Sequence, residues 1–455
     1  MKQLTPQIIA GITGGEYLGD DTGRGACITG AVRDNREVKH GNLFVCISGA
    51  RVDGHSFANS AFESGAACCL AEKVIPDAKG PYVLVKSTLE AIKSIGGYYR
   101  SLFEIPVIGI TGSVGKTTTK ELVAAVLGAK LRVLKTPENL NNELGVPLTL
   151  LSLDEQHEAA VIEMGISGFG EMSRLAEMVR PDIFIITKIG YSHLEELGDL
   201  NGVLMAKTEA FAYMKPDGVA VVNGDDELLL GYDPGMRRFT FGLEKHNDFR
   251  AENITADGVD WVACDIVTDT ERFHAMIPAY GSHIALLSLP AAIIGRLLGL
   301  TDDEIKLGLL SYSPVGGRSN VSDTGYITLI NDCYNANPNS VRAALASLSV
   351  FPNRRVAILG DMLGLGAPTD DLHIELGAFI AQGGPDLLIC CGDKAELIYK
   401  AYTSACGGEA HFYRNKTELI TALPGLIKKG DAVLVKASHD MRFEEFLPVL
   451  SNIKE

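Results

Sequence analysis

The amino-acid sequence predicts an α/β protein of three domains, and two features of the chain predict it. Short apolar runs recur along the 455 residues, each ends in Gly, Asp, Asn or Ser, and helical patterns lie between many of them. Strands that alternate with helices in this way are typical of parallel sheets. At roughly 150 residues per domain, a chain of this length divides into about three units. We therefore expect domains at residues 1–103, 104–314 and 315–455, with boundaries near Glu104 and in the turn Ser313–Asn320.

Each expected domain contains its own candidate strands. In the first domain they are residues 42–48, 66–72 and 82–87, and the segment 56–66 has a helical pattern. In the second they are 105–111, 159–165, 182–190 and 218–226, and in the third 326–332, 354–361, 386–393 and 431–438. The longest apolar run, Ile284–Gly295, contains Pro290 and is shorter than the roughly 20 residues that a membrane span needs, so we expect a buried helix.

The composition excludes several classes of function. A net charge of −16 argues against DNA or an anionic membrane as the main partner. The first residues lack the apolar core and cleavage site of a secretory signal, so we expect a mature, cytoplasmic protein. The nine cysteines are odd in number, form no C-x-x-C pair and lie mostly in apolar runs. We expect them to be reduced and buried rather than disulfide-bonded or bound to zinc.

The stretch Val107–Glu121, VIGITGSVGKTTTKE, has the composition of a phosphate-binding loop between a strand and a helix. Gly112 and Gly115 let the backbone approach phosphate oxygens, and the N-terminus of the following helix favours an anion. Lys116, expected to face solvent, offers a cation to the β- and γ-phosphates, and Thr117 offers a hydroxyl to Mg²⁺. The alternative is a glycine-rich turn without a ligand.

Three residues downstream are candidate metal ligands. Glu163 ends an apolar run, so its carboxylate should emerge at the C-terminal end of a strand, where a Walker-B-type acid holds Mg²⁺. The alternative is a solvated strand-terminal carboxylate. His193 follows another strand, and Lys207 lies on an expected helix. Considered alone, such a histidine is more often a cap or core residue, and such a lysine is usually a solvated charge.

Motifs along nearly the whole chain resemble those of the Mur ligase family. The central domain resembles its ATPase domain in residues 109–119, 139–151, 163–172 and 192–198. Residues 34–66 resemble its UDP-sugar-binding domain, and residues 331–345, which contain YNANP, with 359–366 resemble its C-terminal domain. The resemblance implies an N-terminal UDP-sugar-binding α/β domain, a central P-loop ATPase domain with a mainly parallel sheet, and a C-terminal Rossmann-like domain.

The resemblance also implies an activity. It points to an ATP-dependent ligase that joins D-alanyl-D-alanine to UDP-N-acetylmuramoyl-tripeptide through an acyl phosphate, a step in making peptidoglycan precursors. ATP and Mg²⁺ at two sites would be needed, and Lys207 would carry a carbamate that serves the second Mg²⁺ together with His193. We expect a monomer without nucleic-acid or membrane partners. The domains should close before the chemistry, and Arg318 should lie out of reach in an open, unliganded arrangement.

The site residues that the resemblance implies fall into five groups. The catalytic group is Lys116, His193, Lys207 and Arg318. The ATP group is Thr111, Gly112, Ser113, Val114, Gly115, Lys116, Thr117, Thr118, Asn142, Arg318 and Asp332. The metal group is Thr117, Glu163, His193 and Lys207, and the UDP-sugar group is Asn35, Arg36, Asp53 and His55. The dipeptide group is Tyr334, Asn335 and Asn337.

Some alternatives stay open at this stage. At Asn35, Lys188, Leu287, Gly364 and His439 the chain differs from the usual residue of the family, whereas the phosphate and metal positions are kept. Within the family, the ligase that adds the third amino acid shares the first two domains' motifs. From another class, a nucleotide-gated binding protein would hydrolyse ATP without peptide ligation. Whether the tripeptide ends in meso-diaminopimelate or lysine depends on the shape of the pocket.

Overall fold

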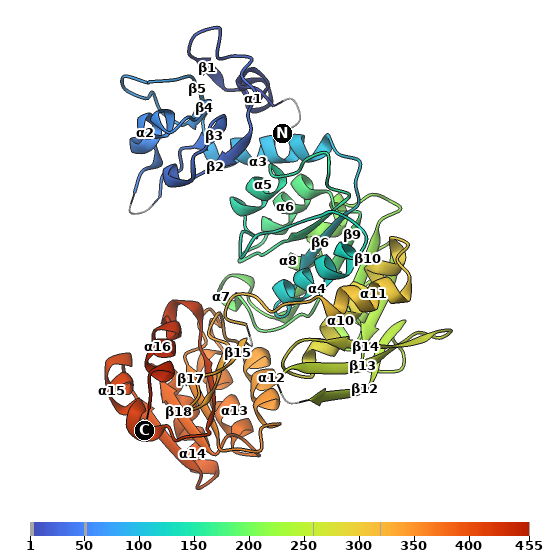
Figure 1. The fold of residues 1–455 in the computed structure, drawn as a ribbon, viewed down its shortest axis with the longest axis vertical. Helices are drawn as coiled ribbons and strands as arrows, with labels where there is room; N and C mark the ends of the chain where they lie inside the picture. The colour runs from blue at the N-terminus through green and yellow to red at the C-terminus, as the bar shows by residue number, and fades with distance from the viewer. Residues whose placement is uncertain (1–3, 50–51, 258, 319, 455) are drawn as a thin grey trace.

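Three β-sheets follow one another along the chain in the computed structural model of the protein, which describes residues 4–49, 52–257, 259–318 and 320–454. Figure 1 shows the corresponding layers, from the blue N-terminal part at the top through the green central part to the orange and red C-terminal part. The three-domain α/β architecture expected from the alternating pattern is confirmed. None of the helices in these ranges combines the length and the apolar character that a membrane crossing requires.

The N-terminal sheet has five strands in the order β1-β5-β4-β3-β2, and all neighbours except β1 and β5 are parallel. The strands are β1 (Glu16–Leu18), β2 (Gly30–Val32), β3 (Asn42–Val45), β4 (Cys68–Ala71) and β5 (Tyr82–Leu84). The helices are α1 (Pro6–Thr13), α2 (Ala58–Glu63) and α3 (Thr88–Ser101), with short 3-10 turns at Asn35–Glu37 and Gly54–Phe57. The helix expected at 56–66 is thus a 3-10 turn followed by the shorter α2.

The central sheet has nine strands in the order β14-β13-β12-β11-β10-β9-β6-β8-β7. The strands are β6 (Val107–Thr111), β7 (Val133–Lys135), β8 (Ala159–Glu163), β9 (Ile183–Ile186), β10 (Val219–Asn223), β11 (Arg237–Gly242), β12 (Phe249–Asp257), β13 (Trp261–Val267) and β14 (Arg272–Ile277). Pairing is parallel from β7 to β12, whereas β12, β13 and β14 form an antiparallel meander that was not predicted from the sequence.

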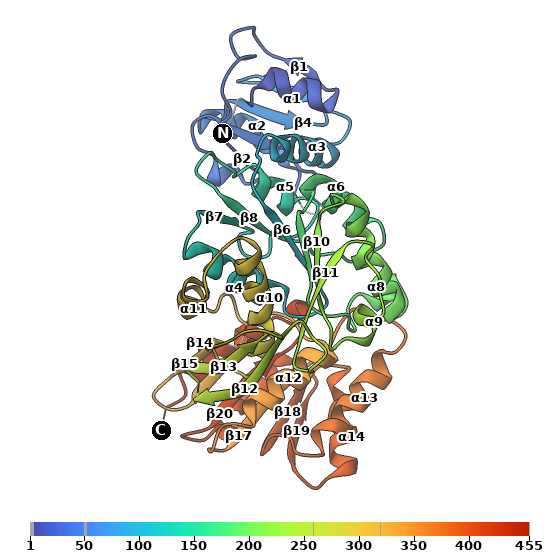
Figure 2. The same ribbon diagram turned by 90° about the vertical axis from the view of Figure 1, so that its right-hand side faces the viewer.

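Helices cover both faces of the central sheet. They are α4 (Lys116–Gly128), α5 (Gly145–Leu150), α6 (Glu171–Val179), α7 (Leu194–Leu197), α8 (Leu200–Thr208), α9 (Glu227–Leu230), α10 (His283–Leu297) and α11 (Asp302–Leu310), with a 3-10 turn at Glu209–Tyr213. One face packs on α4, α10 and α11, and the other on α5, α6 and α8. Figure 2 shows α4, α10 and α11 on one side of the strands and α8 on the other. The expected buried helix is α10.

The C-terminal sheet has six strands in the order β15-β16-β20-β17-β18-β19, and only β15 is antiparallel to its neighbour. The strands are β15 (Asn320–Asp323), β16 (Thr328–Asn331), β17 (Arg355–Gly360), β18 (Leu387–Cys391), β19 (Glu409–Tyr413) and β20 (Ala432–Lys436). The helices are α12 (Pro338–Leu348), α13 (Thr369–Ile380), α14 (Ala395–Ala405), α15 (Lys416–Leu426) and α16 (Phe446–Ser451), with 3-10 turns at His439–Met441 and Phe443–Glu445.

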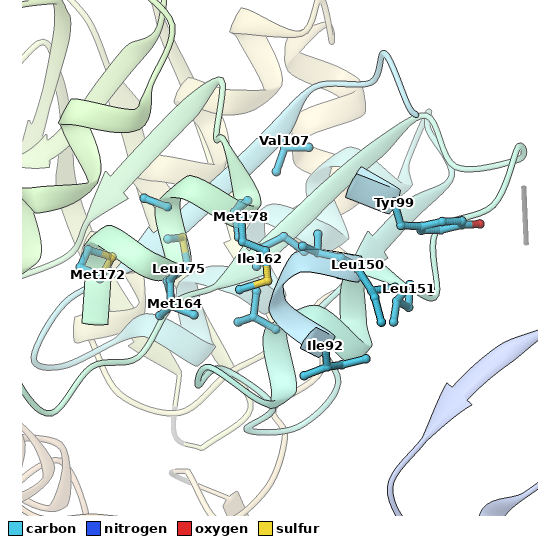
Figure 3. Close-up of a cluster of buried hydrophobic side chains, with 14 of the residues drawn as sticks. Ile92, Tyr99, Val107, Leu150, Leu151, Ile162, Met164, Met172, Leu175 and Met178 are labelled. Atoms are coloured by element: carbon cyan, nitrogen blue, oxygen red, sulfur yellow. The ribbon is translucent and has the colours of Figure 1, made fainter. Parts of the chain in front are cut away.

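One hydrophobic core runs without interruption from the N-terminal sheet into the central domain. Helix α3 links them, because it packs on α1 and also on α5 and α6. Figure 3 shows Ile92 and Tyr99 of α3 beside Leu150 and Leu151 at the end of α5, with Met178 of α6 close by. Each of these side chains is at most 5% exposed. The first two domains are therefore joined by a packed interface.

Candidate active site

The phosphate loop connects β6 to α4 and leaves the helix N-terminus open towards a cleft. Gly112 and Gly115 have φ values of 146° and 86°, which side-chain-bearing residues rarely adopt. A Cβ at Gly112 would lie 1.9 Å from the hydroxyl of Thr187, so this position accepts only glycine. Ser113 is tied to the turn after β9, since its hydroxyl donates to the carbonyl of Gly190 at 2.9 Å. The loop is thus a rigid cradle of backbone N–H groups.

Lys116 is the first residue of α4, and its ammonium donates to the carbonyl of Gly112 at 2.8 Å. The expectation that it faces solvent is wrong, because the side chain is half-buried and lies in the wall of the cleft. Burial, and then the charge of Arg318, lower the pKa of Lys116, while Glu163 acts in the opposite sense. The lysine is therefore held inside the loop, where a phosphate could replace the carbonyl as its partner.

Glu163 is fully buried at the end of β8 and is surrounded by polar groups. Its carboxylate accepts from the hydroxyl of Thr117 at 2.7 Å and from the side-chain amide of Asn141 at 2.8 Å. The ammonium of Lys120 lies 3.8 Å away and donates to the carbonyl of Thr136 at 2.8 Å. Asn141 and Lys120 were not predicted from the sequence. Lys120 had a signal, since it lies one helical turn after Lys116 on α4.

Lys207 lies on α8 as expected, but its side chain is only 2% exposed, so the solvated-charge interpretation is wrong. Within the described ranges no hydrogen bond or ion pair is formed by its ammonium. Burial, and then the charge of Lys116, lower the pKa of Lys207 well below its ordinary value. Desolvation, followed by the charges of Lys207 and Lys116, lowers the pKa of His193 to about 4. Both side chains thus favour their neutral forms near Lys116.

The C-terminal domain contributes the opposite wall of the cleft. The guanidinium of Arg318 lies 3.9 Å above the ring of Tyr334, and that ring in turn contacts His439 with centroids 5.5 Å apart. Arg318 therefore does not lie out of reach here, because it lines the same cleft as Lys116. Lys436, also missed from the sequence, is 3% exposed and donates to the carboxylate of Asp332 at 2.6 Å.

The cleft between the central and C-terminal domains has a volume of about 400 Å³. The expected site residues that line it are Ser113, Val114, Gly115, Lys116, Thr118, Asn142, Glu163, His193, Arg318, Asp332, Tyr334, Asn335 and Asn337. Thr111, Gly112, Thr117 and Lys207 are buried and do not line it. Several of the polar side chains are engaged locally. Asn142 and Asn337 accept backbone N–H groups at the starts of α5 and α12, and Asn335 accepts the N–H of Ala336 at 2.9 Å.

The residues expected to hold a UDP-sugar lie apart from this cleft, in the N-terminal domain. Asp53 accepts from Nδ1 of His55 at 2.6 Å and pairs with Lys73, and these hydrogen bonds lower the pKa of Asp53. His55 also accepts the backbone N–H of Glu72 at 2.9 Å, so both ring nitrogens are occupied. Arg36 pairs with the neighbouring Asp34 and is exposed. Asp53 and His55 thus shape the loop that they belong to.

Comparison with known families matches three parts of the chain. Residues 28–99 match the family described as "Mur ligase family, catalytic domain", residues 110–294 the "Mur ligase middle domain", and residues 317–439 the "Mur ligase, glutamate ligase domain". The three matches fall on the three sheets.

Whole-chain relatives and solved structures agree with these matches. The chain is 35% identical over 436 residues to the UDP-N-acetylmuramoyl-tripeptide–D-alanyl-D-alanine ligase of Bacillus subtilis, covering 92% of each chain. It is 33% identical to the ligase of the same name from Escherichia coli, covering 99% of each. A crystal structure of MurF from Acinetobacter baumannii superposes with a TM-score of 0.89 at 28% identity over 98% of both chains. The crystal structure of MurF from Thermotoga maritima in complex with ADP superposes with a TM-score of 0.81 at 28% identity, over 95% of this chain and 98% of that one.

Proposed function

Because this chain belongs to the Mur ligase family, we propose that it joins D-alanyl-D-alanine to UDP-N-acetylmuramoyl-tripeptide at the expense of ATP, a step in peptidoglycan precursor synthesis. The relatives just named support this reaction over addition of the third amino acid. A structure of the ligase that adds 2,6-diaminopimelate has a TM-score of only 0.52 at 17% identity, which supports a shared fold alone.

The observation that carries the proposal is the joint cleft. A phosphate loop from one domain faces an arginine and a polar segment from the next, so ATP and an acceptor can meet between them. A carboxylate does not react with an amine, because its oxygen is a poor leaving group. Transfer of the γ-phosphoryl group to that oxygen gives an acyl phosphate and ADP. The amine of the dipeptide then attacks the carbonyl carbon, loses a proton, and the tetrahedral intermediate expels phosphate.

The residues of the cleft suit this transfer. Lys116 and Arg318 place two cations beside the N-terminus of α4, and they would stabilise the charge that gathers on the phosphoryl oxygens. Asp332 would contact the nucleotide, and Tyr334, Asn335 and Asn337 would contact the dipeptide. Tyr334 and Asn335 lie in the wall that faces the loop.

The donor set beside the loop fits Mg²⁺. Glu163 is an unexposed carboxylate that accepts two neutral hydrogen bonds, and the hydroxyl of Thr117 lies 2.7 Å from it. Carboxylate and hydroxyl oxygens are ligands that Mg²⁺ prefers. Glu163 and Thr117 would hold one ion, and His193 with a modified Lys207 would serve a second. Bound Mg²⁺ would neutralise phosphate charge.

Lys207 is proposed to carry a carbamate. An ammonium has no lone pair, so a protonated lysine could not serve a cation. Lys207 is 2% exposed and has a pKa well below its ordinary value, which favours the neutral amine. Addition of CO₂ to that neutral amine forms an N–C bond, and loss of one proton leaves an anionic carbamate. The carbamate on Lys207 would then present an oxygen ligand to the second metal ion.

The remaining assignments follow from the family. The domains are proposed to span residues 1–103, 104–314 and 315–455, and the N-terminal domain to bind the UDP-sugar through Asn35, Arg36, Asp53 and His55. Because two of these side chains support their own loop, backbone groups of that loop would make part of the contact. We propose that the protein works as a cytoplasmic monomer.

The test is phosphate release with each UDP-N-acetylmuramoyl-tripeptide, ending in meso-diaminopimelate or lysine, with and without D-alanyl-D-alanine. We expect release only when ATP, Mg²⁺, one tripeptide and the dipeptide are all present, together with a UDP-pentapeptide detected by mass spectrometry. ATP hydrolysis at the same rate with and without the two peptides would instead support the alternative that the chain is a nucleotide-gated binding protein. The same assay identifies the third residue of the tripeptide.

A further inference from the structure

A loop of the C-terminal domain, Met362–Gly366, rests on the start of α7 in the central domain. The backbone N–H of Leu194 donates to the carbonyl of Gly364 at 3.1 Å. Figure 1 shows α7 at the junction of the two domains. Leu194 directly follows His193, so the loop touches the chain next to a proposed metal-site residue. We call residues 362–366 the docking loop.

The fit between the docking loop and α7 is tight at one position. Gly366 has a φ of 63°, and a Cβ there would lie 3.0 Å from the backbone N and Cα of Glu195. Those atoms belong to the backbone and cannot rotate away. Gly364 has a similar φ of 71°, but a Cβ there would meet no atom within 4 Å. The two glycines thus share a backbone conformation and differ in what a side chain would meet.

The docking loop is anchored firmly in its own domain. The backbone N–H of Leu363 donates to the hydroxyl of Ser438 at 2.8 Å, and that of Met362 donates to Nε2 of His373 at 3.0 Å. Leu365 is 1% exposed in the core of the C-terminal domain. The loop therefore moves with that domain.

The backbone at His193 is held by fewer local interactions than the docking loop, which contacts the next residue, Leu194. It adopts a left-handed conformation with φ of 53° and ψ of 35°, which a residue with a Cβ rarely takes and which needs surrounding structure to hold it. It is the N-cap residue of α7, a helix of only four residues. The Leu194–Gly364 bond occupies an N–H group at the start of this helix, where no intrahelical partner exists.

We propose that the docking loop is a positioning device for His193, which takes its working position only when the C-terminal domain is docked. Gly364 supplies the carbonyl, and Gly366 allows the close approach. Domain docking would then complete the second metal site at the moment when Arg318 enters the cleft, so phosphoryl transfer would not begin in an undocked molecule. This inference rests on the proposed function of His193.

The matched pair Gly366→Ala and Gly364→Ala tests the proposal in the full chain. Both variants put an L-residue at a positive φ, so both carry the backbone penalty, but only Gly366→Ala pushes the loop off α7. We expect Gly366→Ala to lower kcat at least ten-fold and to raise the Mg²⁺ concentration needed for half-maximal rate. Gly364→Ala should stay within about three-fold of the wild type.

Hydrogen exchange gives a readout that does not depend on turnover. With a non-hydrolysable ATP analogue and Mg²⁺ present, the amide of Leu194 should be protected in the wild type and in Gly364→Ala, and should exchange at least ten-fold faster in Gly366→Ala. Ser438→Ala removes one of the loop's two hydrogen-bonded anchors without touching α7, and it should also speed that exchange. This variant keeps the test valid if Gly366→Ala does not fold. Equal behaviour of the two glycine variants, or an unprotected Leu194 amide in the wild type, would overturn the proposal. A wild type that exchanges as expected but does not ligate would overturn the proposed function instead.

Discussion

Two buried helix lysines beside the cleft differ in what surrounds their amines. Lys120 is unexposed and donates to the carbonyl of Thr136 at 2.8 Å, with Glu121 at 3.0 Å. Lys207 is equally buried and has no such partner among the described residues. A buried ammonium without a partner is strongly unfavourable, so such a group loses its proton or is modified. Burial alone therefore does not indicate a functional lysine. Burial without a hydrogen-bond or ion-pair partner does indicate a functional role.

The first residue-scale prediction concerns Lys207. We expect Lys207→Ala to lower kcat about 100-fold or more, the size of effect that loss of a group orienting a metal site has. Acetate should restore part of the activity by placing an oxygen ligand in the vacated space. Lys306→Ala is the control, since Lys306 is also a helix lysine but forms a surface pair with Asp303. Full activity of Lys207→Ala without acetate would contradict the carbamate.

The second concerns Lys116. We expect Lys116→Ala to lower ligation by about 10²–10³-fold, because a preorganised cation at the transferring phosphoryl group is lost. Among the described residues, the half-buried side chain donates only to the carbonyl of Gly112, so the melting temperature should change little. Lys130→Ala, just beyond α4 and more exposed, should leave the rate unchanged. A Lys116→Ala enzyme with most of its activity would refute the phosphate-loop assignment.

At the scale of elements, α13 makes the docking loop sensitive to acid. Nδ1 of His373 donates to the carbonyl of Thr369 at 2.6 Å, and Nε2 accepts the N–H of Met362, which requires a neutral ring. Burial lowers the pKa of His373 below its ordinary 6.5. Above pH 6.5 the histidine is neutral in both the folded and the unfolded chain. Below it the unfolded chain binds the proton first, so stability is lost as the pH falls.

This linkage gives an element-scale prediction. The free energy of unfolding should fall between pH 6.5 and 5 by up to about 1.4 kcal/mol per pH unit from this one group. In His373→Gln, whose side chain does not titrate, the slope of the urea midpoint against pH should be smaller. If the slope of the urea midpoint against pH is the same in the wild type and in His373→Gln, His373 does not couple folding to pH.

At the scale of the whole molecule, one aromatic residue joins the central and C-terminal domains. Tyr280 precedes α10 in the central domain, yet its ring is 3% exposed in the core of the C-terminal domain and lies 5.7 Å from the ring of Phe351. Its hydroxyl is buried without a hydrogen-bond partner among the described residues. The ring therefore stabilises the docked arrangement, whereas the hydroxyl contributes nothing to it.

Two substitutions separate these contributions. Tyr280→Ala should empty a core site, cost about 3 kcal/mol or more, and increase the radius of gyration measured by small-angle scattering. Tyr280→Phe keeps the ring and removes an unpaired polar group, so its stability should equal or exceed that of the wild type. A scattering profile of Tyr280→Ala that matches the wild type would show that the ring does not hold the domains together.

Local patterns predicted most of the architecture. Most of the parallel strands were found, because buried strands are continuous apolar runs, as in Ala159–Glu163. The parallel strands β2, β7, β11 and β19 were not predicted, because each is partly exposed and lacks such a run. The meander Phe249–Ile277 was missed, because half-buried antiparallel strands alternate between polar and apolar residues, as the burial pattern of β14 shows. Lys116 was assigned the wrong exposure, since its ammonium folds back onto the carbonyl of Gly112 in the wall of the cleft.

By itself the sequence determined the α/β class, the three domains and the phosphate loop, because each depends on residues adjacent in the chain: apolar runs, glycines with positive φ, and a Lys-Thr-Thr at a helix start. Only the tertiary structure decided which side chains remain available for chemistry. It buried Lys207 without a partner, engaged Asn337 and His55 in local hydrogen bonds, and brought Arg318 to Lys116 across the cleft. The reason is physical, since burial, desolvation and charge depend on distances between groups that are remote in sequence, and these distances exist only once the domains have docked.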